Sequence, residues 1–136
     1  MNVFLDTNTV IDFMGEREGF FEDASVIFSM IYEGRINASM SVLTVMNCAY
    51  ILRKAFDQDA MFEKIDVLCD LVEVLPIYKH PLQEAIHIKP RDYENAVQYL
   101  TACSRDVDVI ITRDKQGFKD FNILVMTPSE FVNKVK

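Results

Sequence analysis

Two stretches of the sequence run from apolar residues into polar residues and a carboxylate in the same way. Val3-Phe4-Leu5 is followed by Asp6, and Val109-Ile110-Ile111 is followed by Thr112, Arg113 and Asp114. We interpret both apolar runs as buried strands, because the β-forming residues in each stop at a polar break. Parallel strands end at one edge of an open sheet, and ligand sites form in the crevice there. Asp6 and Asp114 are therefore expected to face the same opening.

Carboxylates gathered beside buried strands favour a bound cation. Each loses hydration next to the apolar strand, and neighbouring carboxylates repel one another. A hard divalent cation such as Mg²⁺ relieves this repulsion and prefers oxygen ligands. The alternative is structural: Asp6 or a residue beside it caps a short helix over Thr9 to Met14, and Asp114 opens a turn before Gly117. Either segment alone favours this alternative, whereas the pair favours a shared site.

The composition argues against several other kinds of site. The chain has two histidines, so a histidine metal site or a Ser-His-Asp triad is poorly supplied. Its three cysteines lack CxxC spacing, and we interpret them as reduced core residues. Catalysis must therefore rest on carboxylates. The net charge of −7 argues against binding nucleic acid through overall charge, but it leaves room for a local basic rim.

The spacing of the apolar residues predicts strands that alternate with helices. Strands are expected at 3–5, 35–39, 72–77, 107–111 and 123–125, and helices at 20–32, from 42, at 59–71, at 81–87, from 92 and from 128. Continuous apolar strands, instead of alternating ones, indicate a parallel sheet covered on both faces. We therefore predict a single α/β domain over residues 1–136, a three-layer α/β/α sandwich with a central parallel sheet of four or five strands.

The sequence contains no segment that predicts a membrane span or export. No apolar run approaches the ~18 residues that a membrane span needs. The first residues lack the basic start and apolar run of a signal peptide. We expect a cytoplasmic protein that makes no membrane contact.

Four segments, taken in their order and spacing, resemble the PIN domain, the fold of metal-dependent ribonucleases that includes the VapC toxins of bacterial toxin–antitoxin pairs. The segments span nearly the whole chain: Phe4-Leu5-Asp6-Thr7-Asn8, Ser41-Val42-Leu43-Thr44, Asp92-Tyr93-Glu94-Asn95-Ala96 and Ile111-Thr112-Arg113-Asp114. Each motif alone is weak, whereas the four in this order are fairly specific. Within the superfamily the chain is most similar to a bacterial branch with a Tyr-Ile-Leu-Arg-Lys segment, here Tyr50 to Lys54.

The resemblance implies an activity, a cofactor and partners. It implies an endoribonuclease that hydrolyses phosphodiester bonds of single-stranded RNA with Mg²⁺ or Mn²⁺. It implies that this enzyme is the toxin of a toxin–antitoxin pair. It further implies an antitoxin protein as a partner and a homodimer as the assembly.

The resemblance also implies roles for individual residues. The family's first carboxylate falls on Asp6 and its last on Asp114. Thr112 would support Asp114 by hydrogen bonding, and Asn8 would lie beside Asp6. Arg113 lies between two site residues and is the expected phosphate or RNA contact, with a solvated surface charge as the alternative.

The chain departs from the family pattern at two of its four acidic positions. The family's second acid falls on Asn47 and its third on Asn95. An amide oxygen can ligate Mg²⁺, but it brings no charge and cannot deprotonate water. Glu94 cannot copy the direction of position 95, because helical neighbours are ~100° apart, but its longer side chain can reach the crevice. Asp92 is expected as the N-cap of the helix. The expected catalytic and metal-binding set is Asp6, Glu94 and Asp114.

Two functions of different classes are open at this point. The first is the metal-dependent ribonuclease. The second is a degenerate PIN domain that binds RNA or a protein without cutting, which is what two amides in place of two acids predict. A phosphotransferase on a flavodoxin-like sheet is disfavoured, because the sequence has no Walker motif and no suitable phosphate-binding glycine loop.

Overall fold

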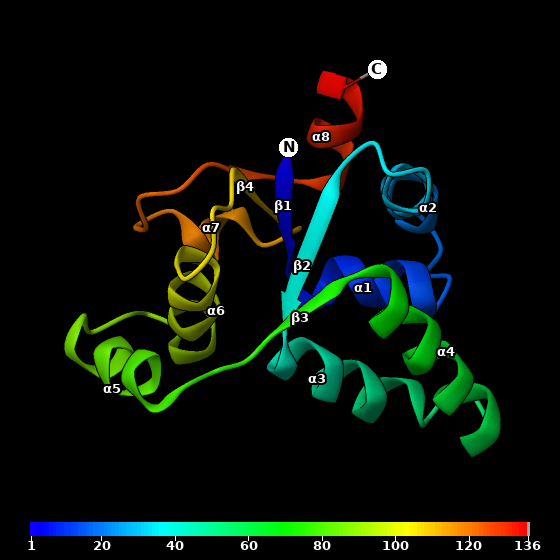
Figure 1. The fold of residues 1–136 in the computed structure, drawn as a ribbon, viewed down its shortest axis with the longest axis horizontal. Coiled ribbons are helices and arrows are strands. Elements are labelled where there is room, and N and C mark those ends of the chain that lie inside the picture. Colours follow the sequence, from blue (N-terminus) through cyan, green and yellow to red (C-terminus); the bar gives the residue numbers. More distant parts are fainter. Residues whose placement is uncertain (136) are drawn as a thin grey trace.

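Five strands form one parallel sheet in the order β3-β2-β1-β4-β5 (Figure 1). The structure is a computed structural model that describes residues 1–135. The strands are β1 (Asn2–Leu5), β2 (Asn37–Ser41), β3 (Glu73–Leu75), β4 (Val109–Ile111) and β5 (Val125–Met126). The helices are α1 (Thr7–Met14), α2 (Phe21–Tyr32), α3 (Val42–Leu52), α4 (Gln58–Leu71), α5 (Lys79–His87), α6 (Tyr93–Cys103), α7 (Lys115–Phe118) and α8 (Pro128–Val135). Within the described residues, no helix is both long and apolar enough to cross a membrane. The predicted α/β fold with a parallel sheet is confirmed.

The register of the sheet places the two predicted carboxylate segments at neighbouring strand ends. β1 pairs with β4, and Leu5 lies opposite Ile111. The pairing extends one residue further, since the Asp6 N–H donates to the Ile111 carbonyl at 3.1 Å. The chain therefore leaves the sheet at Asp6 and Thr112 side by side.

Side chains of the central strands alternate between two helical layers. Val3 and Leu5 of β1 belong to a core built with α1, α2, α3, α4 and α8. Phe4, between them, belongs to a second core with α6 and α7. Figure 1 shows α5, α6 and α7 on one side of the sheet and α1 to α4 on the other. This is the arrangement that continuous apolar strands predict, because both faces of the sheet are covered.

The strand predicted at 35–39 begins two residues later than expected. α2 ends at Tyr32, and Gly34, two residues later, has a φ of +72°, in the left-handed region that glycine adopts without strain. The Arg35 N–H still donates to the Met30 carbonyl at 2.9 Å, so this residue belongs to the helix terminus. Pairing with β1 therefore starts at Asn37, opposite Asn2.

Other boundaries differ near the ends of the sheet. β5 covers only Val125–Met126, because the Ile123 N–H donates to the Phe121 carbonyl at 3.0 Å in a turn that precedes the strand. β3 is limited to Glu73–Leu75 within the predicted 72–77. The segment after Asp114 forms the short helix α7, where only a turn was expected.

The prediction that all three cysteines are core residues is wrong for two of them. Cys48 is buried, whereas Cys69 and Cys103 are exposed. Leu68 takes the inward position on α4 next to Cys69, so helical geometry turns the cysteine outward. All three thiols are free, as expected for reduced cysteines.

Candidate active site

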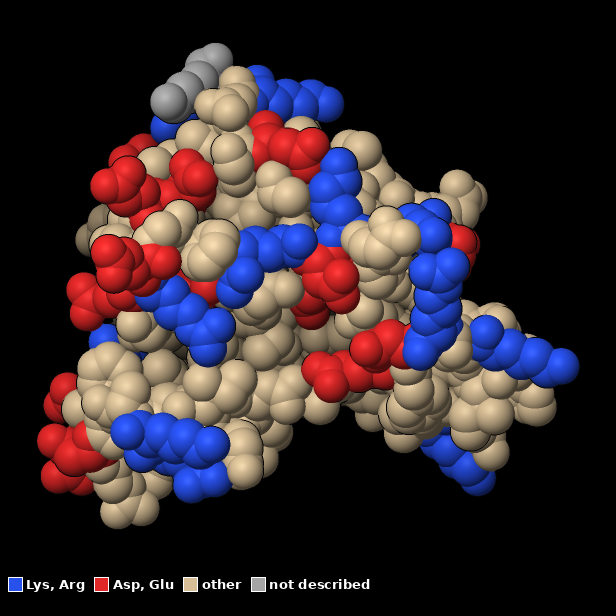
Figure 2. Space-filling view, turned by 180° about the vertical axis from the view of Figure 1, so that it is seen from behind, with Lys and Arg blue, Asp and Glu red and all other residues tan. Residues whose placement is uncertain are grey.

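The predicted site residues gather at the edge of the sheet where its strands end. β1 is followed by Asp6, β2 ends at Ser41 and leads into α3, and β4 leads through Thr112 to Asp114. The first turn of α6 reaches the same edge, because Glu94 accepts a hydrogen bond from α3. In the space-filling view a notch separates two lobes of the molecule, with acidic side chains along its wall and basic side chains further out on both lobes (Figure 2).

Asp6 is the buried carboxylate of this edge, with 6% of its surface exposed. Its Oδ2 accepts hydrogen bonds from Thr112 Oγ1 at 2.8 Å and Asn8 Nδ2 at 3.3 Å. Its Oδ1 accepts from Gln98 Nε2 at 3.4 Å. Asp6 occupies the N-cap position of α1, but its side chain makes no capping hydrogen bond. The short helix that the structural alternative predicted is therefore present, but the Asp6 carboxylate does not cap it.

The electrostatic environment of Asp6 disfavours its negative charge. Burial raises the pKa of Asp6, and the negative charges of Glu94 and Asp114 raise it further, against the lowering effect of the Thr112 hydrogen bond. The charges of Glu94 and Asp114 therefore act on Asp6 across the edge of the sheet. A cation bound among them would relieve this repulsion.

Asp114 is exposed and has two hydrogen-bond partners. Its Oδ1 accepts from the Gly117 N–H at 3.1 Å and so caps α7, as the structural alternative expects. Its Oδ2 accepts from Asn95 Nδ2 at 3.2 Å. The Asp114 N–H donates to Thr112 Oγ1 at 3.0 Å, and this hydroxyl in turn donates to Asp6. Thr112 thus links the two carboxylate segments.

The two amides at the family's acidic positions act as hydrogen-bond donors to carboxylates. Asn47 Nδ2 donates to Glu94 Oε1 at 2.9 Å, which joins α3 to α6. Asn95 Nδ2 donates to Asp114 Oδ2. Asp92 caps α6, with its Oδ1 accepting from the Asn95 N–H at 3.0 Å, and its carboxylate is committed to that cap.

Arg113 points to a buried acid that the sequence did not single out. Its Nε and Nη2 donate to the two carboxylate oxygens of Asp12 at 2.6 Å and 3.1 Å. Its guanidinium also lies 4.0 Å from the centre of the Phe20 ring. The Asp12 side chain is fully buried. Arg113 would have to leave this buried carboxylate to bind RNA, so the contacts favour a structural role over the predicted phosphate contact. Asn8 fixes the backbone here, since its Oδ1 accepts from the Arg113 N–H at 3.0 Å.

Sequence reasoning also missed Gln98 and Gly117. Gln98 lies on α6 four residues after Glu94, so both side chains share one face of the helix. This spacing is the sequence signal that could have identified Gln98, and its burial is seen only in the structure. At Gly117, a Cβ atom would overlap Asp114 Oδ2 and Asn95 Nδ2. The glycine therefore lets α7 approach the hydrogen bond between these two side chains.

Replacing Gly117 with Ala should disturb the site directly. The new methyl group must push Asp114 and Asn95 apart, and we expect a loss of about 1–3 kcal/mol in the free energy of unfolding. Chemical denaturation checks this, with Gln116→Ala on the same short helix as the control, because Gln116 is exposed. Equal stability of the two variants would contradict the close packing at Gly117.

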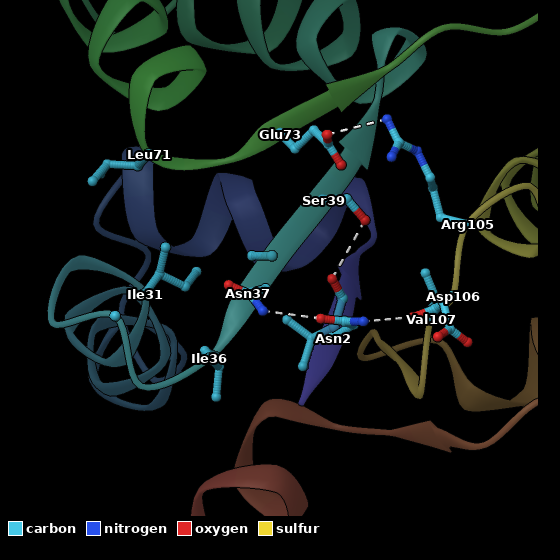
Figure 3. A pocket seen from close by; sticks show the side chains of 13 residues that line it. Asn2, Ile31, Ile36, Asn37, Ser39, Leu71, Glu73, Arg105, Asp106 and Val107 are labelled. Atoms are coloured by element: carbon cyan, nitrogen blue, oxygen red, sulfur yellow. Dashed lines mark hydrogen bonds and ion pairs between the residues drawn. The ribbon is translucent and has the colours of Figure 1, made fainter.

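A second pocket, of about 540 Å³, opens at the opposite edge of the sheet (Figure 3). Arg105 Nη2 donates to Glu73 at 3.1 Å, and Asn2 Nδ2 donates to the Asp106 carbonyl at 2.7 Å. In both hydrogen bonds, donor and acceptor belong to residues that line the pocket. We therefore place the candidate site at the carboxyl edge, where the negative charges of Glu94 and Asp114 act on Asp6.

Comparison with known proteins agrees with this fold. The family model of the PIN domain matches residues 2–116. Similar solved structures are VapBC2 from Rickettsia felis bound to a DNA fragment from their promoter, VapBC-1 from nontypeable Haemophilus influenzae, and FitAcB from Neisseria gonorrhoeae. VapBC2 has a TM-score of 0.68 and 12% identity, and the match covers 93% of this chain and 98% of that one. VapBC-1 has a TM-score of 0.69 and 17% identity, with 95% and 99% covered. FitAcB has a TM-score of 0.65 and 18% identity, with 93% and 98% covered.

No curated protein shows significant similarity to the sequence. At these identities the solved structures share the fold of this chain and support no finer statement. The family model, in contrast, spans every segment that contributes a side chain to the carboxyl edge, from Asp6 to Asp114. The chain belongs to the PIN domain family.

Proposed function

We propose that this PIN domain is a Mg²⁺- or Mn²⁺-dependent endoribonuclease that cleaves single-stranded RNA. One observation carries the proposal: three carboxylates lie at one edge of the sheet, and each accepts a hydrogen bond from a carboxamide. The pairs are Asp6 with Gln98, Glu94 with Asn47, and Asp114 with Asn95. Carboxylates collected in this way, beside a buried strand, suit an oxygen-ligated divalent ion.

The donor atoms fit such an ion in chemistry. All are oxygens. Burial raises the pKa of Asp6, and the negative charges of Glu94 and Asp114 add to this effect. A cation beside Asp6 would favour its charged form. Among residues 1–135, no three acidic, histidine or cysteine side chains are grouped closely enough to hold an ion as they stand. Glu94 is hydrogen-bonded to Asn47 and not grouped with the other two carboxylates.

The affinity of the site for Mg²⁺ is expected to be weak, because two of its side chains are neutral amides. We expect calorimetry to give a dissociation constant on the order of 1 mM. A micromolar dissociation constant would contradict this.

The residues would divide the chemistry between them. Asp6 and Asp114 would hold the ion, with Thr112 and Asn8 orienting Asp6. When bound, the ion would lower the pKa of an attacking water and neutralise charge on the scissile phosphate. Glu94, which is exposed, would be the third ligand and would accept the proton of that water.

Basic and aromatic side chains near the notch suit a single-stranded substrate. Lys89 and Arg91 line a hollow of about 370 Å³ that also includes Gly117, beside Asp114. On α3, the Arg53 guanidinium lies 4.1 Å from the centre of the Tyr50 ring. Such cations contact phosphates, and exposed aromatic rings stack on bases.

We further propose that the protein is the toxin of a toxin–antitoxin pair, acts in the cytoplasm and forms a homodimer. The solved structures of similar fold are toxin–antitoxin complexes, one of them from Klebsiella pneumoniae. Both lobes carry exposed apolar side chains that an antitoxin or a second copy could cover: Met46 and Tyr50 on α3, and Leu82 and Ile86 on α5.

The second candidate function is a binding module that does not cut, which the two amides favour. The test compares cleavage of labelled single-stranded RNA by the natural chain and by the double variant Asn47→Glu, Asn95→Asp. Each protein is assayed with Mg²⁺, with Mn²⁺ and with a chelator. The two added carboxylates should attract the ion, so we expect weak metal-dependent cleavage by the natural chain and stronger cleavage by the double variant.

A charge-matched control separates this effect from net charge. Asn37→Asp with Asn133→Asp adds two carboxylates at exposed positions outside the site and should leave cleavage unchanged. No cleavage by either the natural chain or Asn47→Glu with Asn95→Asp would favour the binding module.

A further inference from the structure

We propose that Gln98 is a positioning residue that holds the Asp6 carboxylate for its metal ion. This inference rests on the proposed metal-dependent function. Three observations support it. The Gln98 side chain is completely buried, it has three hydrogen-bond partners, and one of these partners, Ser41, orients its amide group.

The location of Gln98 makes it a link between three parts of the site. It lies on α6 and contacts Ser41 and Thr44 at the start of α3, together with Asp6 at the end of β1. Thr44 Oγ1 continues the network to Thr7 Oγ1 at 3.1 Å. A fully buried amide must satisfy its donors and acceptor within the protein, and here every partner belongs to an element that borders the site.

Ser41 fixes which way the amide of Gln98 faces. Ser41 Oγ accepts a hydrogen bond from the Thr44 N–H at 3.3 Å, and its own proton goes to Gln98 Oε1 at 2.5 Å. Because the amide oxygen is held by this hydroxyl, both protons of Nε2 face away from Ser41. They reach Thr44 Oγ1 at 2.9 Å and Asp6 Oδ1 at 3.4 Å.

The contact with Gln98 controls the carboxylate atom that the other partners leave free. Thr112 and Asn8 both donate to Asp6 Oδ2. Gln98 donates to Oδ1, and the distance of 3.4 Å leaves that oxygen weakly engaged. Oδ1 is thus oriented by the protein and still able to bind a cation.

Other residue types at position 98 would not perform this role. A glutamate would place a second negative charge against Asp6 Oδ1. A methionine fills a similar volume without hydrogen bonds, so it would leave Ser41, Thr44 and Asp6 Oδ1 without this partner. Groups that support a metal ligand in this way typically change metal affinity by about 10–100-fold.

The test measures Mn²⁺ binding by calorimetry without RNA, and cleavage of single-stranded RNA separately. We expect Gln98→Met to weaken Mn²⁺ binding about 10–100-fold. We also expect it to raise the metal concentration needed for cleavage, with the KM for RNA unchanged. Ser41→Ala keeps Gln98 and removes only the hydroxyl that orients it, so it should weaken Mn²⁺ binding in the same direction even if Gln98→Met folds poorly.

The matched control is Thr101→Val on the same helix. Thr101 is buried one turn after Gln98, and its hydroxyl has no hydrogen-bond partner within residues 1–135, so its loss should leave Mn²⁺ affinity unchanged. A purely structural role of Gln98 would lower the melting temperature without changing Mn²⁺ affinity.

The outcomes separate this inference from the proposed function. The inference is overturned if Gln98→Met and Ser41→Ala bind Mn²⁺ as tightly as Thr101→Val does. It is also overturned if the natural chain binds no Mn²⁺. Mn²⁺ binding that depends on Gln98, without any RNA cleavage, would support the inference and contradict the ribonuclease.

Discussion

Replacing Asp6 with Asn is expected to lower metal-dependent cleavage of single-stranded RNA at least about 100-fold. The loss of a group that only supports a metal ligand already weakens metal binding by about 10–100-fold, and Asp6 is proposed as a ligand itself. Asparagine keeps an oxygen that can accept from the Thr112 hydroxyl, which donates to Asp6 at 2.8 Å. The variant should therefore keep its contact with Thr112, and it loses both the charge and the oxygen that accepts from Gln98 Nε2. The measurement is the rate of cleavage of labelled RNA at one Mn²⁺ concentration, below the dissociation constant of the natural chain.

Asp92→Asn is the control for the same chemical change next to the site. Asp92 caps α6 through its Oδ1, and asparagine is an equally good N-cap, so this variant should cleave like the natural chain. Cleavage that survives in Asp6→Asn would point to a contaminant or another site. Equal losses in both variants would make Asp92 part of the site.

Replacing Arg113 with Met is expected to lower the free energy of unfolding by about 3–5 kcal/mol. The reason is that Asp12 is fully buried, and the guanidinium that would be lost binds both of its carboxylate oxygens. Chemical denaturation measures the effect. Combining Arg113→Met with Asp12→Leu should recover most of the loss, because a buried ion pair can be replaced by apolar side chains more easily than it can be broken.

Arg105→Met provides the exposed comparison. Arg105 pairs with Glu73 at the same 3.1 Å that separates Arg113 Nη2 from Asp12, but both side chains are more than half exposed. Such surface pairs contribute about 0–1 kcal/mol. A similar loss for Arg105→Met and Arg113→Met would contradict the structural role of Arg113. A stable Arg113→Met variant with weakened RNA binding would instead support the phosphate contact that the sequence suggested.

The sequence was sufficient to predict the edge of the sheet at which Asp6 and Asp114 lie. Apolar runs before each residue indicate buried parallel strands, and the ends of such strands share an edge whatever the details of packing. Helix starts were also predictable where local chemistry decides them, as at Asp92, which caps its own helix. β5 was misplaced because a local turn at Ile123 outweighs the apolar pattern.

The partners of individual side chains were beyond prediction from the sequence. Arg113 pairs with Asp12, 101 residues earlier, and no local pattern links the two. The same holds for Asn47 and Glu94, which meet because α3 and α6 converge on the site. From the sequence, Asn47 and Asn95 are only acidic ligands that are missing. In the structure their N–H groups donate hydrogen bonds to Glu94 and Asp114.

We propose that the carboxyl edge of the sheet binds a divalent ion. Crystals of the natural chain soaked in Mn²⁺, well above the millimolar affinity expected, test this by anomalous diffraction. We predict a Mn²⁺ peak in contact with both Asp6 and Asp114, and the loss of that peak in Asp6→Asn. A well-ordered edge with no anomalous peak beside Asp6, or Mn²⁺ bound only elsewhere, would contradict the account.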